Sequence, residues 1–316
     1  MNTFFLDRLN SEPHALAFAG QSTPWPVALA DQSANPALDE ALHTHAAAAQ
    51  ALLYPVSAEL LATTGRPVDL FGFEPNPARL GAAAAASASV PGIALTQLGA
   101  LLDAAALGYN PAQAKPVAVL GHSQGVLAVH MVQAICEAGS IDAAAAKIDE
   151  ILAIATLIGV AGTRQARQLG LAARHGEATP MLSVKDITRA QVDALIERVD
   201  GARGPIAMAV TNSATHYVLS GYPEDLAAFG VEVAKEHKRQ AKLREEKVRG
   251  GRVFDPTLEY LDVTLPFHSP LMADAVSQAV AWAEACGINA DHARELAAEV
   301  LLNHVDWAAR VRALMK

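Results

Sequence analysis

Residues 116–130 read Pro-Val-Ala-Val-Leu-Gly-His-Ser-Gln-Gly-Val-Leu-Ala-Val-His. The apolar run at 117–120 is typical of a short strand buried on both faces. Residues 121–125 fit the pattern G-x-S-x-G, and apolar residues at helical spacing follow. A serine at such a strand-to-helix turn has an exposed hydroxyl beside the N–H groups of a helix N-terminus, which can stabilise an oxyanion. The stretch therefore predicts Ser123 as a nucleophile, and the alternative is an ordinary serine in a tight turn.

Length and composition limit the class of protein. With 316 residues, 52% of them hydrophobic and 18% charged, the chain can form one large domain or two linked ones. Lys and Arg number 24 against 33 Asp and Glu, and this net charge of −9 argues against nucleic acid as a partner. Cys136 and Cys286 lie in helical apolar patterns, which predicts buried thiols in a reducing compartment.

Two observations predict a cytoplasmic protein without a membrane partner. Residues 1–5 contain neither a basic segment nor a long apolar core, so we expect no secretory signal. The apolar stretch at 151–162 is interrupted by Thr156 and is too short to span a bilayer.

The sequence patterns predict both strands and helices along the chain. In the first half, the patterns predict a strand at 15–18 and helices at 36–61, 91–107 and 141–160. From residue 181 onward they predict strands at 181–184, 206–210, 217–220 and 261–265, with helices at 189–199 and 224–236. This β-α-β-β-α-β order resembles a ferredoxin-like unit inserted into a larger α/β layer.

A basic run occupies residues 238–252 of the predicted insert. Its charged members are Lys238, Arg239, Lys242, Arg244, Lys247, Arg249 and Arg252. Such a run is usually a solvated face. The alternative is a docking surface for an acidic carrier domain or for the phosphates of coenzyme A.

His268 is the predicted general base. It lies between the predicted strand at 261–265 and a predicted helix at 271–285, and Pro266 and Pro270 flank it. A lone histidine is more often structural, but a G-x-S-x-G serine upstream favours catalysis. His122 adjoins Ser123 and is a candidate pocket residue rather than the base. The remaining histidines on predicted helices, His43, His45, His130 and His292, are expected at the surface.

Several motifs together resemble the malonyl/acetyl-transferase family of fatty acid and polyketide synthases. An early F-x-G-Q is found at 18–21, G-H-S-x-G at 121–125, F-H-S at 267–269 and V-x-W at 305–307. An asparagine-containing segment at 210–213, followed by V-x-S-G at 218–221, also fits the family. The segments at 121–129 and 248–254 resemble the N-terminal acetyltransferase domain of bacterial, mycobacterial-type, type I fatty acid synthases.

The resemblance implies the fold and a domain division. It implies an α/β-hydrolase-like core formed by residues 1–178 and 266–316, with a ferredoxin-like subdomain at 179–265.

The resemblance also implies an acyl-transfer mechanism without a metal or a permanently bound cofactor. Ser123, deprotonated by His268, would attack acyl-CoA and form an acyl-enzyme, and the phosphopantetheine thiol of an acyl carrier protein would accept the acyl group. The backbone N–H groups of Gln21 and Gln124 would form the oxyanion hole, and Asn212 would line the substrate pocket with His122. Other domains of a multifunctional fatty acid synthase are the further expected partners.

The sequence departs from the family pattern at two places. Malonyl-specific members carry an arginine roughly 25 to 30 residues after the serine, where it would pair with the malonyl carboxylate. Here the first arginine after Ser123 is Arg164, so we expect acetyl or another uncharged acyl group. The family also continues past V-x-W to a Gly-Pro-Gly loop whose carbonyl helps to orient the histidine. The sequence ends at Lys316 before such a loop, which suggests a fragment in which His268 lacks this partner.

Three alternatives stay open at this point. One is a malonyl transferase of the same family. Another is a serine hydrolase or thioesterase, which requires an acid such as Asp262 beside the histidine. The last is a catalytically inactive scaffold domain of a larger enzyme.

Overall fold

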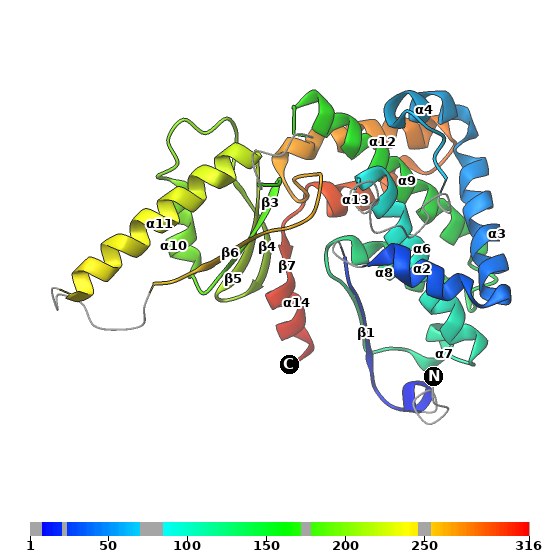
Figure 1. Cartoon of the computed structure of the whole chain (residues 1–316). Helices are drawn as coiled ribbons and strands as arrows, with labels where there is room; N and C mark the ends of the chain where they lie inside the picture. The colour runs from blue at the N-terminus through cyan, green and yellow to red at the C-terminus, as the bar shows by residue number, and fades with distance from the viewer. Residues whose placement is uncertain (1–7, 21–23, 70–84, 172–177, 246–253, 316) are drawn as a thin grey trace. The chain divides into compact units, whose positions relative to one another are not determined.

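The computed structural model describes residues 8–20, 24–69, 85–171, 178–245 and 254–315 (Figure 1). The chain divides into two compact units, each built from two segments of sequence. Residues Met1–Gln165 and Asp274–Val300 form the first unit, and Ala166–Ala273 and Leu301–Lys316 form the second. The division at residues 178 and 266 that the sequence suggested stays a prediction.

The first unit contains a parallel pair of strands. Strand β1 (Ala15–Phe18) pairs with β2 (Ala118–Gly121), with Ala15 opposite Ala118 and Phe18 opposite Gly121. The prediction that this strand is buried on both faces is wrong. Val117 is 68% exposed and the first three residues of β2 are only half-buried. Strand β2 has a strand neighbour on one side only within the described residues, so it is less enclosed than a central strand.

The long helix expected at 36–61 is interrupted. Helix α3 (Pro36–Leu52) is followed by a 3₁₀ turn (Tyr54–Val56) and by α4 (Ser57–Thr64). Pro55 explains the break, because a proline within a helix removes one backbone donor and clashes with the preceding turn. The start of α3 is fixed by Asn35, whose side chain accepts a hydrogen bond from the Ala37 N–H at 3.2 Å.

Helix α6 (Ala86–Ala106) is the core helix of the first unit, and it begins earlier than the predicted residue 91. It packs on α2 (Trp25–Ser33) at two glycines. A Cβ on Gly92 would lie 2.5 Å from the Trp25 ring, and one on Gly99 would lie 2.4 Å from the Gln32 amide. Among the described helices, α6 is long and apolar enough to cross a membrane, but 72% of its most apolar window is buried, as in a core helix.

The other helices complete the first unit. They are α7 (Pro111–Ala114), α8 (Val126–Ala138), most of α9 (Ala145–Gln168), α12 (Ala273–Ala285) and α13 (Ala290–Leu301). Helix α9 begins later and ends later than the predicted 141–160. Two predictions about side chains are wrong. Cys136 is exposed and Cys286 half-buried, and His45 is mostly buried against Asp149, with Nδ1 and Oδ1 2.6 Å apart.

The second unit confirms the predicted ferredoxin-like element order. Strand β3 (Met181–Lys185), α10 (Arg189–Ile196), β4 (Ala207–Ser213), β5 (His216–Ser220), α11 (Pro223–Glu245) and β6 (Thr257–Tyr260) follow one another along the chain. The sheet order is β6-β3-β5-β4-β7, and the pairs among the first four strands are antiparallel. The α/β fold class with a ferredoxin-like element is therefore confirmed.

Helices α10 and α11 cover one face of this sheet (Figure 1). Apolar side chains from the strands and both helices form the core, with Leu182, Leu219, Val192 and Phe229 among its fully buried members. The last strand of the ferredoxin-like element is β6 at Thr257–Tyr260 rather than the predicted 261–265. Its alternating pattern explains the difference, because Leu258 and Tyr260 contact the core.

Two elements near the end of the chain complete the second unit. Strand β7 (Val305–Asp306) joins the sheet parallel to β4, with Val305 opposite Val210. Helix α14 (Trp307–Leu314) follows directly, and the Asp306 side chain caps it by accepting from the Ala309 N–H at 2.8 Å. The sequence analysis identified the V-x-W motif in this segment but predicted neither strand β7 nor helix α14.

Candidate active site

Ser123 lies at a sharp turn between strand and helix, as predicted. Strand β2 ends at Gly121, Ser123–Gly125 form a 3₁₀ turn, and α8 begins at Val126. Ser123 has a φ of 53°, in the left-handed region that side chains other than glycine rarely adopt. This backbone conformation is the one expected of a nucleophile elbow.

Two glycines permit this turn through close backbone contacts. A Cβ on Gly121 would lie 2.4 Å from the Val126 nitrogen, and one on Gly125 would lie 2.2 Å from the Phe18 carbonyl oxygen. The Phe18 oxygen also accepts a hydrogen bond from the His122 N–H at 2.9 Å. The glycines of G-x-S-x-G are therefore required by packing against β1 and the start of α8.

Of the two residues predicted to form the oxyanion hole, the structure describes Gln124 but not Gln21. Gln124 lies in the first turn, where backbone N–H groups precede the hydrogen bonds of the helix. Gly20 packs against this turn, because a Cβ there would lie 2.5 Å from the His122 oxygen and 3.0 Å from the Gln124 nitrogen. Gln21 lies outside the described residues, so its assignment stays a prediction.

The side chain of Gln124 is fully buried. Neither its Oε1 nor its Nε2 has a hydrogen-bond partner among the described residues. An amide buried in this way is costly unless water or a ligand satisfies it. His122, which precedes Ser123 in the sequence, is half-buried. Its place in a substrate pocket stays a prediction.

His268 lies in the second unit and is 2% exposed. Its φ of 57° places it, like Ser123, in the left-handed region. Its Nδ1 lies 2.8 Å from the backbone carbonyl oxygen of Asn303. Because a carbonyl only accepts hydrogen bonds, Nδ1 carries the hydrogen and Nε2 is the ring atom that can take a proton. The neighbouring Ser269 donates its N–H to the Leu301 carbonyl at 3.1 Å.

The expectation that His268 lacks an orienting carbonyl is therefore wrong. The carbonyl comes from Asn303, just before β7, and not from a later loop. No side-chain pattern could have identified Asn303, because any residue supplies a backbone carbonyl. The pairing of Ser123 with His268 stays a prediction, since the two residues belong to different units.

Asn212 lies near the end of β4 in the second unit. Its Nδ2 is 3.5 Å from Nε2 of His216, and the same ring nitrogen lies 3.1 Å from Oγ of Ser183. The side chains of Asn212, His216 and Ser183 thus form a polar cluster across three neighbouring strands, β4, β5 and β3. The pocket role of Asn212 stays a prediction.

Helix α9 is apolar at residues 151–158, in the region where malonyl-specific sequences carry an arginine. All residues from 151 to 158 are at most 1% exposed, and Thr156 donates to the Leu152 carbonyl at 3.0 Å. Lys147, on the preceding turn, pairs with Glu150 at 2.7 Å. Arg164 donates to Oε1 of Gln278 at 2.7 Å, and its guanidinium lies 5.9 Å from the centre of the Trp282 ring. Both cations thus have partners elsewhere in the first unit.

The basic run falls partly outside the described residues. Helix α11 carries Lys238, Arg239, Lys242 and Arg244, whereas residues 246–253 are not described. Arg239 binds Glu236, with Nη2 and Oε1 2.6 Å apart. A docking role for this face stays a prediction.

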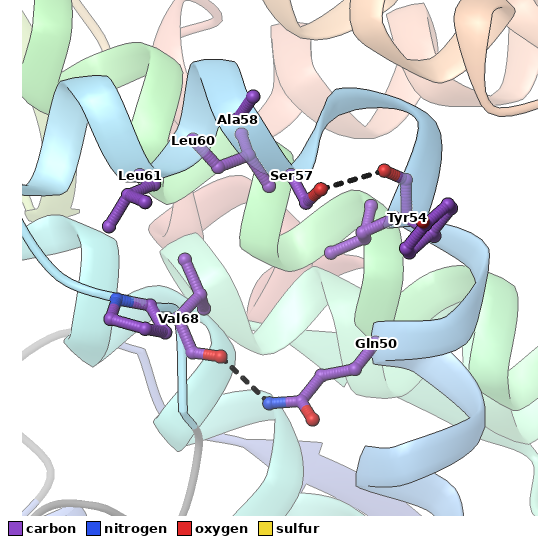
Figure 2. Close-up of a pocket in the computed structure, with 9 residues that line it drawn as sticks. Gln50, Tyr54, Ser57, Ala58, Leu60, Leu61 and Val68 are labelled. Atoms are coloured by element: carbon purple, nitrogen blue, oxygen red, sulfur yellow. Dashed lines mark hydrogen bonds between the residues drawn. The ribbon is translucent and has the colours of Figure 1, made fainter.

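A separate apolar cavity of about 470 Å³ lies on helices α3 and α4 of the first unit (Figure 2). Leu53, Leu60, Leu61 and Val68 are among its walls, and the Gln50 amide at its edge donates to the Val68 carbonyl at 2.8 Å. None of the predicted site residues lines it. In the described part of the chain, no three His, Cys, Asp or Glu side chains are grouped to hold a metal ion.

The fold is that of malonyl-CoA–acyl carrier protein transacylases. The enzyme of that name from Xanthomonas oryzae pv. oryzae matches with a TM-score of 0.59 and 18% identity, over 97% of this chain and 85% of that one. The enzyme from Coxiella burnetii matches with a TM-score of 0.57 and 17% identity, over 96% and 84%. A type II polyketide malonyl-transacylase, solved in complex with its acyl carrier protein, gives 0.58 and 17%, over 96% and 85%.

Sequence comparisons point to fatty acid synthases. The family model "Fatty acid synthase central AT domain" matches residues 180–260. The fatty acid synthase beta subunit hexB of Dothistroma septosporum is 27% identical over 164 residues, which cover 48% of this chain and 8% of that protein. Fatty acid synthase 2 of Mycosarcoma maydis is 30% identical over 175 residues, 52% of this chain and 5% of that protein. The matched segments thus span less than a tenth of the length of these relatives.

Proposed function

We propose that this chain transfers an acyl group, specifically acetyl, from coenzyme A to the phosphopantetheine thiol of an acyl carrier protein. His268 Nε2 takes the proton of Ser123 Oγ as the oxygen attacks the thioester carbonyl. The tetrahedral intermediate then collapses, and the thiol of coenzyme A leaves with that proton. The carrier thiol repeats these steps in reverse on the acyl-enzyme and releases Ser123.

The observation that carries this proposal is the backbone of Ser123. A serine held at a φ of 53° between a strand and a buried helix is a strained arrangement that an ordinary turn does not require. Its occurrence in a transacylase fold, within a sequence that resembles fatty acid synthases, supports acyl transfer.

The acid–base arrangement supports a transacylase over a triad hydrolase. A triad hydrolase directs an acidic side chain to Nδ1 of the histidine. In this chain the Nδ1 hydrogen is donated to the backbone carbonyl of Asn303 instead. A Ser–His dyad oriented by a carbonyl therefore fits the described contacts.

The choice of acetyl rests on the apolar surroundings in the first unit. A buried carboxylate requires a paired cation, because its desolvation is otherwise too costly. No arginine occurs between Ser123 and Arg164, and Arg164 is engaged with Gln278 and Trp282. These features favour an uncharged acyl group over malonyl.

The larger relatives support a multidomain setting. We infer that the chain works beside other catalytic domains and a carrier domain of a type I, mycobacterial-type fatty acid synthase in the cytoplasm, where it primes fatty acid synthesis. This inference is supported by the similarity to long fungal synthase chains and to a transacylase solved with its carrier protein.

Intact-mass spectrometry tests the proposal directly. Wild type and Ser123→Ala are incubated briefly with acetyl-CoA or with malonyl-CoA. An acetyl adduct adds about 42 Da and a malonyl adduct about 86 Da, and either depends on the nucleophile. We expect the acetyl adduct alone, on wild type alone, and its transfer to a holo carrier protein.

Other results separate the alternatives. An adduct that water removes faster than the carrier thiol does would indicate a thioesterase. A malonyl adduct alone would contradict the acetyl assignment and leave acyl transfer standing. The Arg164→Met variant is a check on the same point, because its acyl preference should equal that of wild type if Arg164 only joins α9 to α12.

A further inference from the structure

Gln97 is a buried amide side chain on helix α6, whose buried residues are mostly apolar. The residue is 9% exposed, and its Nε2 donates to the backbone carbonyl oxygen of Ala19 at 2.5 Å. Burying an amide is unfavourable unless its groups are hydrogen-bonded. Oε1 of Gln97 nevertheless has no partner among the described residues. The amide is therefore present for the bond to Ala19 rather than for packing alone.

The bond to Ala19 fixes the chain that leaves β1. The Ala19 carbonyl belongs to the planar peptide that leads into Gly20, so holding this oxygen also fixes the direction of the Gly20 N–H. Gly20 in turn packs directly on the nucleophile turn. A Cβ on Gly20 would lie 2.8 Å from the Ser123 Cβ and 3.0 Å from the Gln124 nitrogen.

Gln97 and the turn therefore hold the end of β1 from two directions. On one side, the Phe18 carbonyl accepts from the His122 N–H at 2.9 Å and contacts Gly125. On the other, Gln97 holds the next carbonyl along the chain. This pair of contacts sets the position of the Ala19–Gly20 peptide relative to the Gln124 N–H, all within the first unit.

We propose that Gln97 is a positioning residue for oxyanion stabilisation. It holds the Ala19–Gly20 peptide against the turn, so that the space beside the Gln124 N–H keeps the shape that the developing oxyanion requires. The inference rests on the proposed function, because an oxyanion forms only if Ser123 attacks a carbonyl. Removal of a direct oxyanion donor lowers kcat about 10²–10³-fold, and a residue acting through the backbone should have a smaller effect, on the order of tenfold.

Gln32 provides a matched control in the same unit. Its Nε2 also donates to a backbone carbonyl, that of Thr96 on α6, at 2.9 Å. Its Oε1 is likewise buried without a partner among the described residues. The two glutamines thus make the same kind of bond, but the bond of Gln32 joins α2 to α6, whereas that of Gln97 holds the chain that leaves β1. Loss of either bond should lower stability similarly, and only loss of the Gln97 bond should slow acylation.

The experiment compares Gln97→Met, Gln97→Glu and Gln32→Met with wild type. Acetylation of Ser123 is followed by rapid quench and intact mass over a range of acetyl-CoA concentrations, and the folded fraction is measured by circular dichroism. For Gln97→Met we expect the maximal acylation rate to fall about tenfold while the half-saturating concentration changes less than about twofold. For Gln32→Met we expect a rate within about twofold of wild type.

Gln97→Glu adds a pH signature that a purely structural role would not produce. An ionised carboxylate cannot donate to the Ala19 carbonyl, whereas the neutral acid can. The acylation rate of Gln97→Glu, divided by that of Gln97→Met at the same pH, should therefore rise as the pH falls. The ratio removes the titration of the general base, which both variants share.

The outcomes separate this inference from the proposed function. Equal acylation rates in Gln97→Met and Gln32→Met, with an adduct clearly formed by wild type, would overturn the positioning role alone. A ratio for Gln97→Glu that does not change with pH would overturn the hydrogen bond as its cause. Absence of any adduct on wild type Ser123 would overturn the proposed function and the inference with it.

Discussion

His268 and Asn303, 35 residues apart in sequence, are joined by a hydrogen bond of 2.8 Å from the ring Nδ1 to the backbone carbonyl oxygen. The bond sets the tautomer of the imidazole and leaves Nε2 as the proton acceptor. Because the partner is a backbone atom, the orientation of His268 depends on the path of the chain before β7 and on no particular side chain there.

Replacing His268 should abolish general-base catalysis while the fold persists. We choose His268→Asn, because asparagine tolerates the left-handed φ of 57° better than alanine does. Acylation of Ser123 by acetyl-CoA should slow about 10²–10⁴-fold, as for the loss of a general base. The rate is measured by intact mass against time.

His304→Asn is the matched control for this variant. His304 lies in the same unit and also donates its Nδ1 hydrogen to a backbone carbonyl, that of Met208, at 2.8 Å. Its replacement should leave acylation within about twofold of wild type. Equal losses in the two variants would show that the effect of His268→Asn is structural.

The strained backbone of Ser123 predicts a stability difference between two inactive variants. Ser123→Gly relieves the left-handed conformation, whereas Ser123→Ala retains it. The glycine variant should be more stable to urea unfolding than the alanine variant by about 1 kcal/mol, since the left-handed region costs side chains other than glycine 1–2 kcal/mol. If the alanine variant is equally stable or more stable, Ser123 is not strained in solution.

Gly125→Ala should disrupt the turn, because its Cβ would lie 2.2 Å from the Phe18 carbonyl oxygen. We expect the unfolding free energy to fall by several kcal/mol, or the variant to fail to fold. The nearest atoms are backbone atoms of Phe18 and Ala19, which cannot move aside as a flexible side chain can. Gly230→Ala on α11 is the control. Among the described residues, its Cβ would meet only Leu258 Cδ1 at 3.7 Å, so the variant should gain up to about 1 kcal/mol from helix propensity. Chemical denaturation of both variants checks this contrast.

Acid should weaken the second unit through Glu236. Hydrogen bonds from Arg239, and then from Gln240 and Arg198, lower the pKa of this buried carboxyl to about 2. A folded-state pKa below the unfolded one stabilises the protein above the unfolded pKa, and that contribution is lost as the pH falls towards the folded value. Stability should therefore decline between about pH 4.5 and pH 2, the two ends of this shift.

The Glu236→Gln variant tests the origin of this decline. Its urea midpoint should fall below that of wild type at pH 6, and the difference should narrow as the pH approaches 2, because the variant cannot titrate. Glu232→Gln, on the same helix, serves as the control. A pH dependence identical in wild type and Glu236→Gln would contradict the assignment.

Local patterns predicted most elements because their causes lie within a few residues. The short, mostly apolar runs at β3 and β5, the glycines around Ser123 and the helical periodicity of α8 each reflect short-range geometry. The prediction of a strand at 261–265 was wrong for a different reason. Its apolar residues are also buried, and only pairing with β3 decides that Thr257–Tyr260 forms the strand.

Contacts between distant segments could not be predicted in the same way. The carbonyl of Asn303 on His268 and the amide of Gln97 on Ala19 both involve backbone oxygens, which every residue offers. The sequence marks neither partner. The burial of His45 against Asp149 likewise depends on which helices meet, and periodicity alone does not determine that.

The division of the second unit into two stretches of sequence bears on the order in which a ribosome makes the chain. Residues 166–273 contain strands β3, β4, β5 and β6 of the sheet and His268, but β7 and the Asn303 carbonyl arrive only with residues 301–316. A nascent chain that has emerged only as far as residue 300 therefore has its histidine without the acceptor that fixes its tautomer. Under the proposed function, a histidine with a fixed tautomer should therefore appear only after residues 301–316 have been made.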